Sequence, residues 1–248
     1  MSNRMEHAAT ELLNELKDKS INIITVESAT GGKIISSLVD IPFYGSYIYG
    51  SIVTYDTDAK RFIVKVKHAD IYTDITAKQM AIGALENSRA FSALSITGYA
   101  APAPIDRLEK LGTVDVAFAI RTKTDLTTGD HNYSVFNRNF NFCKDDVDDH
   151  IIKLCLEYKE QATEFGMVDS ELVKTLRNVL REEMAIGSMK FATSKLQDLL
   201  CISIDQNDII NYLDIDKVCT TSYDQSYVGE PSYIIGNNID YTNQCELN

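Results

Sequence analysis

The feature that most constrains the fold is a short apolar run that ends in a polar turn and continues as a helix. Residues 21–26 (INIITV) are rich in apolar and β-branched side chains, which is typical of a buried strand. The chain then passes through ESATGG at residues 27–32, and from residue 33 apolar side chains recur at helical spacing. The segment therefore predicts a strand, a tight turn and a helix.

Ser28 lies in this turn, where a small polar group is held rigidly beside the start of a helix. The amides and the dipole of such a helix end favour an anion or a developing oxyanion. Ser28 is therefore a candidate nucleophile, with amides near Gly31 and Gly32 as candidate oxyanion donors. The alternative is structural: Ser28 and Thr30 cap the helix and the glycines allow the tight turn. On local sequence alone, this capping interpretation is the simpler one.

Strand and helix patterns alternate through the first two thirds of the chain. Further strands are expected over residues 47–55, 91–97, 113–121 and 131–140. Helices are expected over residues 5–19, 33–40, 75–90 and 145–160, with a short helix that carries Lys60 after Asp56. This order predicts an α/β fold, a three-layer α/β/α sandwich with a mixed sheet and an antiparallel pair at one edge. We expect one domain over residues 1–162.

The character of the chain changes in residues 163–248, which form an acidic C-terminal extension. Two helices and a strand are expected there, over residues 170–183, 188–200 and 201–204. Residues 232–244 (SYIIGNNIDYTNQ) resemble residues 46–58 (SYIYGSIVTYDTD). The extension is either a small α/β appendage that is a degenerate partial second copy of the first half, or a chance similarity between two apolar strand patterns.

Charge and composition argue against several classes of protein. The net charge of −12, with no basic stripe, disfavours nucleic-acid binding. No apolar run is long enough to cross a membrane, and the first residues form an amphipathic helical pattern without a signal-peptide core. The five cysteines include no C-x-x-C pair and the four histidines are scattered. We therefore expect reduced thiols, a cytoplasmic protein, and neither a metal centre nor a cofactor.

A serine nucleophile needs a base, and no histidine stands at an obvious strand end. Lys60 follows a strand end closely, and serine–lysine pairs are an established variant of the catalytic triad when the lysine pKa is depressed. Tyr55 ends the same strand and could relay a proton, while Thr97 and Gly98 end the next predicted strand. Each residue also has an ordinary interpretation, as a solvated lysine, a half-buried tyrosine or a strand-end hydroxyl. Their joint placement at successive strand ends favours a site.

Six ordered blocks resemble the CinA C-terminal domain family: VESATGG (26–32), GS (45–46), VTYDTDAK (53–60), MAIGAL (80–85), TGYAAP (97–102) and LGTVDVAFA (111–119). Members of that family are nicotinamide-nucleotide amidases. They convert nicotinamide mononucleotide, a small-molecule nucleotide, to the nicotinic acid form and ammonia without a metal. The resemblance implies that Ser28 is the nucleophile, Lys60 the base and Tyr55 its partner, with Thr30, Ser46 and Thr97 positioning the substrate. It also implies a homodimer.

Two departures from the family pattern affect phosphate recognition. The family loop TGIAGPGGG is TGYAAPAPID at residues 97–106, so glycines that let amides approach a phosphate are missing. The family arginine in a GDR motif aligns best with Lys144, which cannot form a bidentate contact. The alternative function is a catalytically silent family member that serves as a nucleotide-binding or assembly module. An altered substrate, such as a nucleotide adduct, is a third interpretation.

Overall fold

A computed structural model describes residues 1–124, 131–144 and 148–198 and contains a five-stranded sheet of order β2-β1-β3-β4-β5. The parallel part consists of β1 (Ile23–Glu27), β2 (Ile48–Val53) and β3 (Ser92–Gly98). Two antiparallel strands, β4 (Thr113–Thr124) and β5 (His131–Asn141), extend it at one edge. The predicted mixed sheet with an antiparallel pair at its edge is confirmed.

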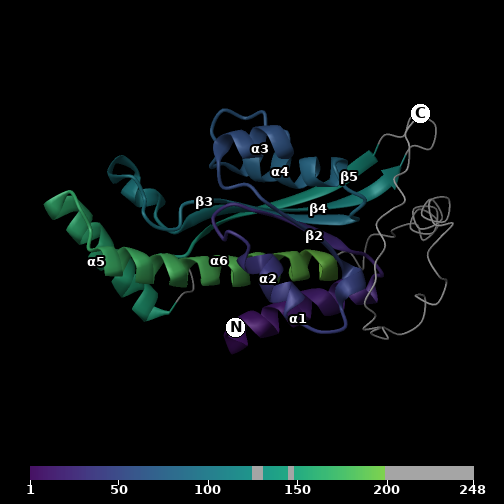
Figure 1. Ribbon diagram of the computed structural model, residues 1–248, viewed down its shortest axis with the longest axis horizontal. Helices are drawn as coiled ribbons and strands as arrows, with labels where there is room; N and C mark the ends of the chain where they lie inside the picture. The colour runs from purple at the N-terminus through teal and green to yellow at the C-terminus, as the bar shows by residue number, and fades with distance from the viewer. Residues whose placement is uncertain (125–130, 145–147, 199–248) are drawn as a thin grey trace, which may run out of the picture. The chain divides into compact units, whose positions relative to one another are not determined.

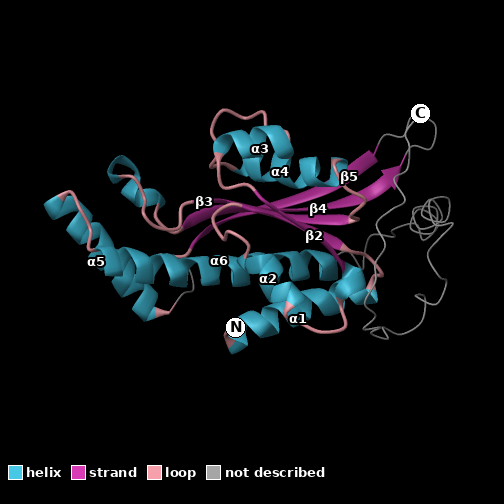
Figure 2. Ribbon diagram, in the orientation of Figure 1, coloured by secondary structure: helices cyan, strands magenta, loops and turns pink. Residues whose placement is uncertain are grey.

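Helices cover both faces of this sheet (Figures 1 and 2). One face carries α1 (Asn3–Asp18), α2 (Lys33–Val39) and α6 (Ser170–Asp198). The other face carries α3 (Thr57–Ile63) and α4 (Asp74–Glu86). Helix α5 (Asp149–Phe165) packs against α6 and the short helix η2 (Ile105–Lys110), and a second short helix, η1 (Gly45–Tyr47), precedes β2. The three-layer α/β/α sandwich is therefore the observed architecture.

Strand β1 is central to the core, and all five of its residues are buried. Its side chains alternate between the two faces, as in any strand. Ile24 and Val26 pack into an apolar cluster with Met80 and Ala81 of α4. Thr25 and Glu27 point to the opposite face, where the Glu27 carboxylate contacts the start of α2. This alternation decides which helix layer each residue at the end of β1 meets.

Helix α6 differs from the sequence prediction, because a single helix spans the region where two were expected. Gly187 does not interrupt it: one glycine costs a helix only about 1 kcal/mol. A Cβ at this position would lie 2.6 Å from the ring of Phe142, so the glycine allows that ring to approach. α6 packs against α1, α2, β3 and β4. The domain boundary expected after residue 162 stays a prediction.

The expected strand at residues 201–204 and the proposed second copy lie outside the described residues. Among the helices that the structure does describe, none is both long and apolar enough to span a membrane.

The expectation of reduced thiols is wrong for one pair, because Cys143 and Cys155 form a disulfide. Cys143 follows β5 and Cys155 lies in α5, and their Cα atoms are 5.9 Å apart. This separation is ordinary for a disulfide. The pairing joins residues twelve positions apart, which no C-x-x-C search would find.

Candidate active site

The carboxyl ends of β1, β2 and β3 meet at one edge of the sheet, because these strands are parallel. Ser28 immediately follows β1, and its amide donates to the Ile96 carbonyl of β3 at 3.2 Å. On the other side, the Thr54 amide donates to the Glu27 carbonyl at 2.9 Å. The backbone at Ser28 is therefore held between the ends of both neighbouring strands.

Lys60 extends from α3 to this same edge. Its Nζ donates to the Thr54 carbonyl at 2.8 Å and to the Tyr55 carbonyl at 3.3 Å, and its side chain is fully buried. The amine is therefore anchored to the backbone one strand away from Ser28. Strand alternation places Ser28 on the face of Val26, which is the face that α3 and α4 cover. Burial lowers the pKa of Lys60 to about 8.

Glu27 changes the predicted role of the helix amides. Its carboxylate accepts hydrogen bonds from the amides of Gly32 (2.9 Å), Ile34 (3.1 Å) and Ile35 (2.8 Å). The start of α2 is therefore already occupied by a buried anion, and the prediction that the Gly32 amide binds an oxyanion is wrong. The N-cap of α2 is Gly32, with no capping side chain, so Ser28 and Thr30 do not cap this helix. The sequence signal for this arrangement was an acidic residue six positions before the first residue of the helix.

Unpaired donors lie instead in the loop that follows Ser28. Within the described ranges, the amides of Ala29, Thr30 and Gly31 have no hydrogen-bond acceptor. The buried hydroxyls of Thr30 and Thr54 also lack partners there. Gly31 adopts a φ of +57°, the left-handed conformation that bends successive amides into an anion-binding concavity. This loop can therefore supply the oxyanion donors.

Stability offers a direct test of the Glu27 contacts. Replacing Glu27 with alanine should lower the free energy of unfolding by about 3 kcal/mol, because three amides lose a charged acceptor. Urea denaturation followed by circular dichroism measures this loss. The control is Glu11→Ala, which removes a half-exposed ion pair with His7 and should cost less than about 0.5 kcal/mol. Equal losses in the two variants would contradict the assigned role.

Two arginines of α6 complete the site, and sequence reasoning missed both. Arg181 donates to the Thr30 carbonyl from Nε (3.1 Å) and Nη2 (2.6 Å), which pins the loop after β1. Arg177 donates to the Tyr55 hydroxyl at 3.0 Å and to the Ala101 carbonyl. The pair thus ties the loops after all three parallel strands to one helix. Local sequence shows only two arginines four residues apart, with no sign of the loops that they contact.

These guanidinium groups repel each other. The pKa of Arg181 is lowered by burial and by the positive charge of Arg177, while Glu27 and Tyr55 act in the opposite direction. No carboxylate among the described residues forms a salt bridge with either arginine. Two half-buried like charges that form no salt bridge with the described carboxylates favour binding of an anion between them.

The other predicted binding residues take different places. The Thr97 hydroxyl donates to the Ile71 carbonyl at 2.6 Å, so it positions the loop before α4. Gly98 lies against the backbone of β4, where a Cβ would approach the Thr113 carbonyl to 2.3 Å. Ser46 is exposed in η1, before β2, and so lies at the opposite edge of the parallel strands from Ser28. This placement follows from sequence order, because Ser46 precedes its strand, Ser28 follows its own, and the two strands are parallel.

Lys144 is exposed in the turn after β5. Strands β3 and β4 separate β5 from β1, which puts this lysine roughly 14 Å from the end of β1 at ~4.8 Å per strand. The described contacts therefore do not bring Lys144 to Ser28. Arg177 and Arg181 instead contact the loops that follow the parallel strands. In the parts of the chain that are described, no cluster of three or more His, Cys, Asp or Glu side chains could hold a metal ion.

The comparisons with known proteins agree with this architecture. The sequence pattern of the CinA C-terminal domain matches residues 5–142, more than half of the chain. The chain belongs to the CinA C-terminal domain family. A CinA-like protein from Leptospira borgpetersenii serovar Hardjo-bovis (strain L550) is 36% identical over 134 residues, which cover 52% of this chain and 32% of that protein. Another from Chloroherpeton thalassium is 34% identical over 113 residues, covering 44% and 27%.

Solved structures of this family share the fold. A competence/damage-inducible protein, CihA, from Agrobacterium tumefaciens has a TM-score of 0.58 at 22% identity, covering 79% of this chain and 98% of that one. A CinA superfamily protein from Klebsiella pneumoniae has a TM-score of 0.57 at 17% identity, covering 78% and 98%. The chain spans about a third of the length of the curated relatives that it matches. The matched region ends before α5 and α6, so both arginines lie outside it.

Proposed function

We propose that this chain is an amidohydrolase that needs no metal and converts nicotinamide mononucleotide, or a related pyridine nucleotide, to its acid form and ammonia. One observation carries the proposal: a buried lysine with a pKa of about 8 is fixed to the backbone at the end of β2, the strand that pairs with the one that Ser28 follows. An amine with this pKa is partly neutral near physiological pH and can accept the serine proton. The unpaired amides of residues 29–31 lie in the same turn and match the needs of an oxyanion.

The chemistry follows from these positions. Neutral Lys60 accepts the proton as Ser28 Oγ attacks the carboxamide carbon. The amides after Ser28 stabilise the tetrahedral oxyanion. The C–N bond then breaks, and ammonia leaves with a proton returned through Lys60 or Tyr55. Water hydrolyses the acyl-enzyme, which restores the serine and releases the carboxylate.

The arginines of α6 supply the phosphate recognition that the altered loop and Lys144 left in doubt. Arg177 and Arg181 lack a carboxylate partner within the described residues, and a phosphate monoester would neutralise their repulsion. Two tyrosines, Tyr72 and Tyr99, are the residues that we propose to contact the aromatic ring of the substrate. Tyr72 and Tyr99 have ring centroids 4.1 Å apart, and the pKa of Tyr72 is raised by burial and by the nearby Tyr99 and Tyr55.

Ammonia release from nicotinamide mononucleotide and from the phosphate-free riboside tests the proposal, with purified protein and a chelator present. The mononucleotide should be the better substrate. Arg181→Ala should raise its KM by roughly 10- to 100-fold, the effect of one charged hydrogen bond, and change the riboside KM far less. A purely structural role for Arg181 would impair both substrates equally. The control Arg61→Ala removes an exposed arginine of α3 and should alter neither KM.

These measurements distinguish the proposed activity from the alternative, a catalytically silent family member that only binds the nucleotide. Binding of the mononucleotide without ammonia release would indicate a nucleotide-binding module instead of an enzyme. Neither binding nor release would overturn both functions. The expected homodimer and cytoplasmic location stay predictions.

A further inference from the structure

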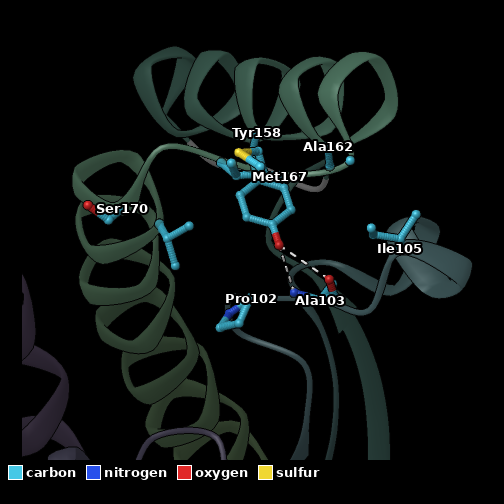
Figure 3. Close-up of a pocket in the computed structure, with 10 residues that line it drawn as sticks. Pro102, Ala103, Ile105, Tyr158, Ala162, Met167 and Ser170 are labelled. Carbon is cyan, nitrogen blue, oxygen red and sulfur yellow. Dashed lines mark hydrogen bonds between the residues drawn. The ribbon is translucent and has the colours of Figure 1, made fainter.

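An apolar pocket of about 400 Å³ lies beside the candidate active site. Its walls come from the loop after β3, from α5, from the α5–α6 turn and from the start of α6: Pro102, Ile105, Tyr158, Ala162, Met167 and Val173. Figure 3 shows Tyr158 extending across this space to the backbone of Ala103, and its hydroxyl accepts from the Ala103 amide at 3.0 Å. The volume is within the range of small-molecule sites.

The pocket and the arginine pair share one face of α6, because Val173 lines the pocket. Val173, Arg177 and Arg181 are spaced four residues apart, so they lie on the same side of the helix. At 1.5 Å per residue, Val173 is about 6 Å from Arg177 and about 12 Å from Arg181 along the helix axis. The Ala101 carbonyl binds Arg177, and the next residue, Pro102, already lines the pocket.

One wall of the pocket carries residues in which this chain departs from the family pattern. Ala103 and Ile105 stand where the family loop TGIAGPGGG has glycine, whereas Pro102 is common to both. This wall therefore has apolar side chains that the family pattern lacks.

We propose that the preferred substrate is a dinucleotide that carries the same carboxamide, with its second nucleoside in this pocket. This inference rests on the proposed function. The pyridine carboxamide would reach Ser28, the diphosphate would lie against Arg177 and Arg181, and the planar second base would bury its faces among the apolar side chains. The reaction keeps its balance: the carboxamide and one water give a carboxylate and ammonia, and the diphosphate stays intact.

Calorimetry on the full chain carrying Ser28→Ala tests this preference, because that variant should bind ligand without consuming it. Nicotinamide adenine dinucleotide should bind at least about tenfold more tightly than nicotinamide mononucleotide, since its second base buries additional apolar surface. Val173→Trp, which fills the pocket, should remove this advantage while the mononucleotide still binds. The matched control Thr175→Trp adds the same ring on an exposed face of α6 and should leave both affinities unchanged.

A second, smaller change tests the pocket without the risk that a large new side chain, as in Val173→Trp, disrupts folding. Met167 is 74% exposed at the rim of the pocket, and Met167→Ala should fold normally yet weaken dinucleotide binding a few-fold. Equal affinity for the two ligands, or a dinucleotide preference that survives Val173→Trp, would overturn the inference and leave the proposed function standing. Failure to bind either ligand would instead refute the proposed function as well.

Discussion

Ser28→Ala is expected to reduce ammonia release by at least about 10⁴-fold, because no other group can form the acyl-enzyme. Ser28 is held between the ends of β2 and β3, so its replacement leaves the backbone of the loop in place. Nicotinamide mononucleotide should therefore still bind, with a Kd within about threefold of the original value. Steady-state ammonia release and calorimetry measure the two effects separately.

The matched control is Ser36→Ala, which removes an exposed hydroxyl from α2. It should retain full turnover. A structural role for Ser28 predicts a different pattern, in which the unfolding free energy falls and turnover falls only in proportion to the folded fraction. Full turnover by Ser28→Ala would exclude the proposed mechanism.

Lys60→Met should also reduce kcat/KM by at least about 10³-fold, since the serine would lose its base. The pH dependence of ammonia release by the unmodified protein tests this proposed role. With its pKa lowered from 10.5 to about 8, Lys60 is more often neutral as pH rises. Hence kcat/KM should increase about tenfold per pH unit below pH 8 and level off above it. A profile that stays flat from pH 6 to 9 would contradict the assignment of Lys60 as the base.

Stability measurements separate the role of Lys60 in catalysis from its role in folding. Its pKa is lower in the folded than in the unfolded chain, so the unfolded chain binds more protons between pH 8 and 10.5. The free energy of unfolding should therefore rise with pH across that window, and Lys60→Met should lose this rise. At pH 7 the free energies of unfolding of Lys60→Met and of the unmodified protein should differ by less than about 2 kcal/mol. The variant loses two hydrogen bonds, but it no longer buries a charged amine. Lys67→Met, at an exposed position, is the control and should keep both properties.

Much of the fold could be predicted because it depends on local pattern. The strand at residues 23–27 follows from a continuous apolar run, and β4 and β5 follow from period-two alternation. Asp56 and Thr73, which are typical capping residues, cap α3 and α4. The two helices predicted over residues 170–200 form a single helix, and the role of Gly187 within it is non-local: its missing side chain lets the ring of Phe142, far away in sequence, approach α6.

The candidate site could also be predicted only in part from local sequence. The placement of Ser28 and Lys60 at one edge of the sheet could be predicted, because each lies within a few residues of a strand end and parallel strands bring those ends together. Ser46 and Lys144 were chosen by resemblance, and sheet topology separates them from Ser28. Glu27 was within reach of local reasoning, but its partners are amides that only the turn geometry presents to it.

The sequence by itself determined the three-layer sandwich and the edge of the sheet where the candidate chemistry lies, because both follow from the order and spacing of strands and helices. Only the tertiary structure decided which charges meet that edge. Arg177 and Arg181 reach it from a helix some 150 residues after Ser28, and a contact at that distance depends on how α6 packs under the sheet. No local pattern encodes such packing, since it is a property of the whole core.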